Sequence, residues 1–196
     1  MKLHAVFLLA GALVVAGCAG VEPVPVQVHV PLPASTAPDA VPLGRGAWRV
    51  PPFTAPGLYR ERAVVYSEDG GLTLRQHPYQ FWLDSPAALW RERLVAGMRA
   101  AGVEAHADRG TAAFEVRGRV QSFDRLVAGA ESTARLAIEL EVVDTGTGEG
   151  RLSRGYEERQ PAAANDAAGT AAAAAVALST IHRRFVADLM DAFAGR

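Results

Sequence analysis

Two segments with alternating side chains constrain the fold of this chain more than any other feature. Apolar residues alternate with charged or polar ones over residues 114–121, and again over residues 135–142. Side chains along a β-strand point in turn to the two faces of a sheet, so each segment is predicted to be a strand with one buried face. The polar face of the first segment is rich in arginine and that of the second in glutamate. We therefore expect these two strands to pair with each other.

Shorter patterns predict further strands. Residues 62–66 and 72–76 flank a turn that contains two glycines, which indicates a hairpin. The glycine-containing turn at residues 144–148 leads to another predicted strand over residues 151–159.

Two amphipathic helices are also predicted. The first begins after a serine that can cap it and a proline that suits its first position, and it ends before a glycine. These residues are Ser85, Pro86 and Gly102. The second helix is expected to begin near Asn165 or Asp166 and to end by Ala194, with low-complexity disorder as the alternative for residues 162–175. His182 in this helix is expected to be solvated.

These elements predict one domain over residues 47–196. Its class is α/β (α+β), with two layers: a mostly antiparallel or mixed sheet, and two main amphipathic helices on one face of it. The chain of 196 residues is long enough for such a domain to bury a real core.

Residues 1–17 are typical of a signal peptide. Lys2 precedes an uncharged apolar run of about 13 residues, whereas a helix needs roughly 20 to cross a bilayer. The run ends with Val15, Ala16 and Gly17 directly before Cys18, the single cysteine of the chain. This ending resembles the lipobox of bacterial lipoproteins, in which leucine is usual at the place of Val15. The resemblance implies cleavage before Cys18 and lipid on its sulfur; the alternative is an ordinary signal peptide with a coincidental cysteine.

Lipid on Cys18 would hold the mature chain on a membrane that faces the periplasm. Each buried methylene contributes about 0.8 kcal/mol, and several acyl chains together anchor a protein permanently. Ala19 stands where aspartate retains an enterobacterial lipoprotein in the inner membrane. The resemblance therefore favours the periplasmic face of the outer membrane. The covalent lipid is the only cofactor expected.

Residues 18–46 are predicted to be a proline-rich tether between the lipid and the domain. Proline fixes its own φ and disfavours helix in the residue before it, so the segment should be extended. Alternate valines over residues 24–30 support a second interpretation, in which this part is an edge strand of the domain.

The sequence contains no recognisable catalytic or metal-binding motif. Its five histidines include no pair at metal-ligand spacing, and the nucleophile and phosphate-loop motifs are missing. We interpret His77 as a turn or rim residue, and Glu139 and Glu141 as a solvated pair on the outward face of a strand. The formal net charge of −1 argues against a nucleic-acid binder. We therefore expect no metal, no catalytic residue and no enzymatic activity.

Three of the fourteen aromatic residues lie close together, at Tyr79, Phe81 and Trp82. Aromatic side chains are enriched at the anchors of protein interfaces, so this cluster is a candidate partner surface. The alternative is a strand that is buried on both faces.

The order of these features resembles the ABC-type transport auxiliary lipoprotein family, the PqiC-like proteins associated with MCE (mammalian cell entry) lipid transport systems. The resemblance covers residues 47–193 and is most specific from Tyr79 to Gly102. It implies a non-enzymatic outer-membrane lipoprotein that assists an MCE-domain protein and the permease and ATPase of an ABC transporter. The cargo would be phospholipid or another hydrophobic molecule crossing the periplasm. The family's lipid-attachment cysteine carries over onto Cys18, and a homo-oligomer is compatible with the resemblance.

Two other functions compete with this interpretation. The proline-rich tether would suit a lipoprotein that regulates peptidoglycan synthesis by binding a synthase. A hydrolase with a dispersed site would need a serine or aspartate beside His77 or His106.

Overall fold

The two alternating segments form the centre of the structure, a computed structural model that describes residues 27–32, 46–107 and 111–194. Strands β6 (Phe114–Ala128) and β7 (Glu131–Asp144) pair antiparallel, and β8 (Gly150–Pro161) pairs antiparallel with the other side of β7. Arginines of β6 lie opposite glutamates of β7, as predicted. The expected pairing of the two strands is therefore confirmed.

The free side of β6 is shared by two groups of shorter strands. At its start lie β2 (Trp48–Arg49), parallel to β6, and then β5 (Ala105–His106). At its end lies β3 (Ala63–Ser67), also parallel to β6, followed by the antiparallel β4 (Arg75–Trp82). The predicted hairpin is confirmed as β3 and β4, although β4 starts later than expected and includes the aromatic cluster. The eight strands form one mixed sheet.

Part of the expected tether belongs to the sheet. Residues Val28–Val30 form β1, which runs parallel to β4 at the edge of the sheet. Val30 faces the core and is 4% exposed, whereas Val28 is 46% exposed. The edge-strand alternative is therefore correct for these three residues, because their alternation gives the sheet one apolar side chain to bury. Residues 18–26 and 33–45 of the expected tether lie outside the described part of the chain.

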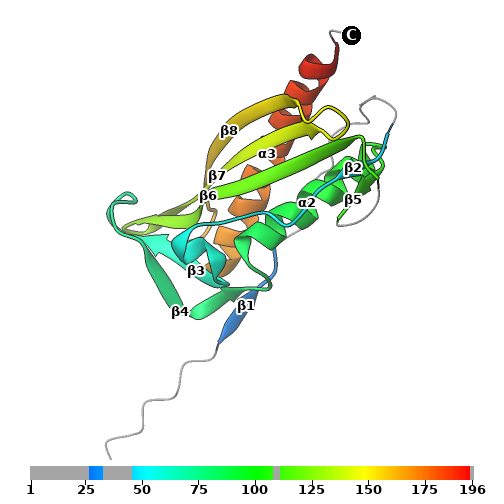
Figure 1. Cartoon of the computed structure of the whole chain (residues 1–196). Helices are drawn as coiled ribbons and strands as arrows, with labels where there is room; N and C mark the ends of the chain where they lie inside the picture. The colour runs from blue at the N-terminus through cyan, green and yellow to red at the C-terminus, as the bar shows by residue number, and fades with distance from the viewer. Residues whose placement is uncertain (1–26, 33–45, 108–110, 195–196) are drawn as a thin grey trace, which may run out of the picture.

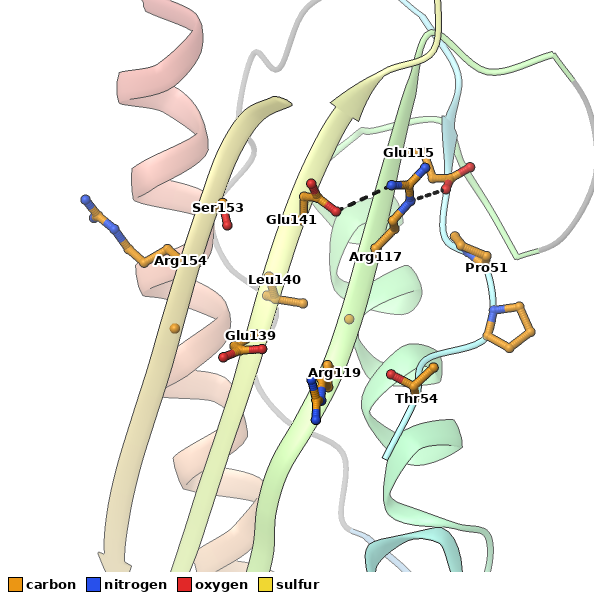
Figure 2. A pocket seen from close by; sticks show the side chains of 13 residues that line it. Pro51, Thr54, Glu115, Arg117, Arg119, Glu139, Leu140, Glu141, Ser153 and Arg154 are labelled. Carbon is orange, nitrogen blue, oxygen red and sulfur yellow. Dashed lines mark hydrogen bonds and ion pairs between the residues drawn. The ribbon is translucent and has the colours of Figure 1, made fainter. Parts of the chain in front are cut away.

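Two helices cover one face of the sheet, as predicted (Figures 1 and 2). In α2 (Pro86–Ala100), the side chain of Ser85 accepts a hydrogen bond from the backbone N–H of Ala88 at 3.4 Å. Gly102 has φ +83°, a conformation that favours glycine, just after the end of this helix. The long helix α3 (Ala167–Ala194) begins directly after Asp166 and packs against β7 and β8. A short 3₁₀ helix, η2 (Gly57–Arg60), precedes β3.

The two helices approach each other closely at Gly97 of α2. A Cβ atom at this position would lie 1.7 Å from Cε1 of His182 in α3, so only glycine fits there. His182 is 5% exposed, and the expectation that it is solvated is wrong. The spacing of apolar residues along α3 revealed the stripe that faces the sheet. It could not reveal that α2 covers a second side of the same helix.

The burial of His182 makes stability depend on pH. Burial lowers the pKa of His182 to about 4 in the folded protein, whereas an unfolded histidine titrates near 6.5. Between these values the unfolded chain binds the extra proton, so stability is complete above pH 6.5 and falls as the pH drops toward 4. We expect a loss of about 3 kcal/mol over this range. Urea unfolding at several pH values measures the slope, which should be smaller in His182→Gln; an equal slope would contradict the assignment.

Candidate interaction surface

The face of the sheet opposite the helices carries a charged groove. Figure 2 shows the side chains of β6 and β7 projecting from this face, with α2 and α3 behind the sheet. The groove has a volume of about 680 Å³ and extends across β6, β7 and β8. Its floor comes from the outward residues of the two alternating strands, and Pro51 and Pro52 line one side. Glu139 and Glu141 therefore lie on the outward face, as predicted.

Ion pairs order one end of the groove. Glu115 is 7% exposed and accepts hydrogen bonds from Arg49 of β2 and, at 2.8 Å, from Arg117. Arg117 also reaches Glu141 on the neighbouring strand at 3.5 Å. The hydrogen bond from Arg117, together with Arg49, lowers the pKa of Glu115 against the opposing effect of burial. This end of the groove therefore carries its charges in a fixed, mutually neutralised arrangement.

The middle of the groove is different, because its charges are not paired with one another. Arg119 lies opposite Glu139 across β6 and β7, and Glu139 lies opposite Gly155 of β8. No hydrogen bond or ion pair joins the side chain of Arg119 or of Glu139 to any other described residue. A Cβ at Gly155 would meet no atom within 4 Å, so the face is open beside Glu139. The side chains of one cation and one anion are thus unpaired in the open groove.

The proline side of the groove is formed by the segment from Pro51 to Thr54, which runs beside β6. The backbone N–H of Thr54 donates to the carbonyl of Gly118 at 3.0 Å, and Val120 donates back to Thr54 at 2.8 Å. The ring of Phe53 in this segment packs directly against Gly118, where a Cβ would lie 2.6 Å from the ring. Proline has no N–H to donate, so Pro51 and Pro52 do not continue the ladder from β2 to Thr54.

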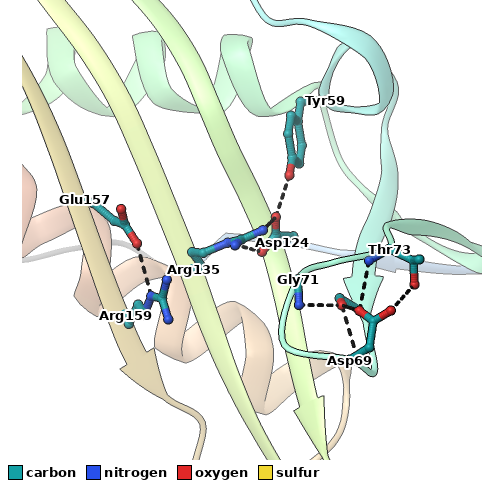
Figure 3. A network of polar contacts seen from close by, with 9 residues as sticks. Tyr59, Asp69, Gly71, Thr73, Asp124, Arg135, Glu157 and Arg159 are labelled. Atoms are coloured by element: carbon teal, nitrogen blue, oxygen red, sulfur yellow. Dashed lines mark hydrogen bonds and ion pairs between the residues drawn. The ribbon is translucent and has the colours of Figure 1, made fainter.

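A buried polar network lies further along the same strands (Figure 3). Arg135 of β7 donates two hydrogen bonds to Asp124 of β6, at 3.0 and 2.8 Å. The hydroxyl of Tyr59 in η2 donates to Asp124 at 2.5 Å, and burial followed by this carboxylate raises the pKa of Tyr59. Asp124 is 4% exposed, so these contacts fasten η2 to the sheet and leave no charge there for a partner.

The geometry can be compared with known proteins. The model of a family described as ABC-type transport auxiliary lipoprotein components matches residues 28–186. The chain belongs to this family. The match begins at the first residue of β1, which agrees with the place of that strand in the sheet of this auxiliary lipoprotein. A search among curated proteins gives no match.

Solved structures share the fold of the auxiliary lipoprotein at low sequence identity. A Xanthomonas campestris protein superposes with a TM-score of 0.72 and 16% identity, over 82% of this chain and 93% of its own. A second, uncharacterized protein gives a TM-score of 0.70 and 12% identity, over 84% and 99% of the two chains. A hypothetical protein from Chlamydia trachomatis gives 0.50 and 9%, over 76% and 99%. These likenesses show the fold alone.

The aromatic cluster of the auxiliary lipoprotein is divided between core and surface. Trp82 is 2% exposed and makes an edge-to-face contact with Phe123 at 5.2 Å, so it is not available to a partner. Tyr79 is 38% exposed. Phe81 is half-buried beside His29, with 5.9 Å between the ring centroids. The prediction of a partner surface is therefore wrong for Trp82, which lies in the core on the same face of the sheet as its partner Val30.

The hydrolase alternative would use His77 or His106. His77 is half-buried, and its Nδ1 accepts a hydrogen bond from the backbone N–H of Tyr79 at 3.2 Å. His106 lies beside Glu104, at 3.1 Å.

Over residues 27–32, 46–107 and 111–194, no three His, Cys, Asp or Glu side chains are placed to hold a metal ion. In the same ranges, no helix has the length and apolar character that a membrane span requires. Val15, Ala16, Gly17 and Cys18 lie outside the described residues.

Sequence reasoning missed the groove itself. Alternation predicted the floor as a solvated strand face. It did not predict the side formed by Pro51 and Pro52 or the opening at Gly155. Gly155 was a usable signal, since glycine inside a strand often marks a close approach of another molecule. The contact between Arg49 and Glu115 joins residues far apart in the sequence and leaves no local pattern.

Proposed function

We propose that this chain is an outer-membrane lipoprotein, anchored through lipid on Cys18, that acts as a non-enzymatic accessory of an ABC transporter. The transporter would include an MCE-domain protein and move phospholipid or another hydrophobic cargo across the periplasm. The family match and the lipobox-like residues Val15, Ala16 and Gly17 support the anchor and the association with a transporter.

The observation that carries the proposal is the unpaired Arg119 and Glu139 in the open groove. An acyl chain binds in an apolar cavity, whereas this groove has a charged floor. Complementary charges across an interface give specificity toward a protein partner. The groove is therefore proposed as the surface that binds a protein component of the transporter.

Crosslinking in intact cell envelopes, followed by purification of the full-length lipoprotein, tests this proposal. An MCE-domain protein or a transporter subunit should be recovered with the wild type. Arg119→Glu and Glu139→Arg should each reduce that recovery by about tenfold, because like charges facing each other across an interface oppose binding. Arg183→Glu, on the exposed side of α3, is the control and should leave recovery unchanged. Recovery of neither component with the wild type would refute the proposal.

The structure weakens the argument for the alternative function, a regulator of peptidoglycan synthesis. That alternative depended on a tether of residues 18–46, but β1 already begins at Val28. Only ten residues then lead from Cys18 to the sheet, in place of the longer reach that such a regulator would use.

A further inference from the structure

Several exposed apolar side chains of this domain lie near β1. Six large hydrophobic residues are exposed in the described ranges, and three of them are Val28 on β1, Tyr79 next to the partner of Val28 on β4, and Leu83 directly after β4. These three are 46%, 38% and 55% exposed, whereas Leu72, which is 88% exposed, lies in the turn at the other end of β4. Exposed apolar residues that cluster, rather than scatter, mark a contact surface.

The register of the hairpin explains why Tyr79 is displayed there. Ala63 pairs with Phe81, and Val65 pairs with Gln76, so two steps along β3 correspond to five steps along β4. The extra residues form a bulge around Pro78, and a bulge redirects the side chains of its strand. Tyr79 lies in β4 between this bulge and Gln80, the residue that pairs with Val28 of β1. We call Val28, His29, Tyr79 and Phe81 the β1–β4 corner.

A second groove adjoins the corner. It has a volume of about 600 Å³ and is lined by residues that include His29, Phe81, Arg62 and Glu61. Gln27, the last residue before β1, lines it too. Its lining thus combines aromatic rings with one cation and one anion. A tyrosine with an apolar ring and a polar tip is the type of side chain found where a bilayer meets water.

The length of chain between the corner and Cys18 limits where the corner can lie. Ten residues span at most about 36 Å, even when fully extended. The 14 residues of β7 alone extend over about 48 Å. Figure 1 shows β1 at the end of the molecule opposite the C-terminal turn of α3. With Cys18 held in a bilayer, the β1–β4 corner can then lie at most about 36 Å from the anchor, which is less than the length of β7.

We propose that the β1–β4 corner rests on the surface of the bilayer that holds the lipid of Cys18. This inference rests on the proposed lipid anchor and adds an orientation to it. The domain stands with β1 and the bulge of β4 among the headgroups, and with the turn between β7 and β8 in the periplasm. The charged groove then faces sideways, where a protein component can reach it.

The test uses the full-length, lipidated protein in vesicles of phosphatidylethanolamine and phosphatidylglycerol. Because Cys18 is the only cysteine and its sulfur is occupied by lipid, a second cysteine provides a single reactive thiol. Tyr79→Cys carries an environment-sensitive fluorophore at the corner, and Thr147→Cys carries it in the exposed turn between β7 and β8. Flotation reports anchoring, thermal unfolding reports folding, and spin-labelled lipid quenches fluorophores at the membrane.

We expect both labelled proteins to float with the vesicles and the label at position 79 to be quenched several-fold more strongly than that at 147. A label at Val28→Cys should behave like that at 79. Flotation with equal quenching at 79 and 147 would overturn the orientation while leaving the anchor in place. Failure to float would overturn the anchor and the orientation together. If the fluorophore at position 79 changed its environment only after an MCE-domain protein was added, the β1–β4 corner would bind that protein and not the bilayer. That result would also overturn the inference.

Discussion

Replacing Asp124 with alanine is expected to cost about 3–5 kcal/mol of the free energy of unfolding. The side chain of Asp124 is fully buried, and its partner Arg135 is only 17% exposed. Removal of the carboxylate leaves a largely buried guanidinium without its counter-charge and the hydroxyl of Tyr59 without its acceptor. Breaking one half of a buried ion pair is costly for this reason, even where the intact pair adds little to stability. Urea unfolding measures the change.

The matched control is the Glu157–Arg159 pair of β8, which Figure 3 shows beside the buried pair. These side chains are 54% and 58% exposed, so Glu157→Ala should change stability by less than about 1 kcal/mol. Tyr59→Phe removes one hydrogen bond of the buried network and should cost about 1 kcal/mol. Similar losses for Asp124→Ala and Glu157→Ala would show that the network does not hold η2 against the sheet.

Trp82→Ala should destabilise the domain by about 3–5 kcal/mol, as expected for truncating a large aromatic residue in a core. Trp82 contacts the ring of Phe123 and lies on the side of β4 that faces the helices. Its indole N–H has no acceptor among the described residues, so Trp82→Phe removes no hydrogen bond and should be much milder. Thermal and urea unfolding compare the two variants.

Tyr79→Ala is the control for this experiment, because Tyr79 lies on the same strand but is partly in solvent. It should change the free energy of unfolding by less than about 1 kcal/mol. If Trp82→Ala folded with wild-type stability and lost only partner binding, the assignment of Trp82 to the core would be wrong. The pair of variants thus separates packing from recognition within a single aromatic cluster.

The pattern of residues was sufficient to predict most of the framework. Period-two alternation placed β6 and β7 and their facing charges, because the pleat of a strand is a local property of the chain. The start of α2 at Pro86 and the start of α3 after Asp166 were predicted closely, because caps and proline positions act within one helical turn. The alanine-rich start of α3 forms helix because alanine has the highest helix propensity, and Ala171, Ala173, Ala174 and Ala175 are buried there.

The candidate surface was only half predictable. The charges of Arg117, Arg119, Glu139 and Glu141 follow from alternation, but the groove also needs Pro51 and Pro52 beside β6. That approach depends on hydrogen bonds between residues near 54 and residues near 118, and such a separation leaves no periodic signal. Lipid attachment at Cys18 stays a prediction from the sequence, since Cys18 lies outside the described residues.

The sequence by itself determined most of the strands and helices and which face of each central strand is charged, and it predicts lipid attachment at Cys18. Each of these depends on residues within a few positions of one another. Only the tertiary structure decided that Val28–Val30 joins the sheet, that Trp82 is in the core, and that His182 is buried against Gly97. Those outcomes depend on which element, distant in the sequence, packs over a given side chain, and that is settled only when the whole domain has folded.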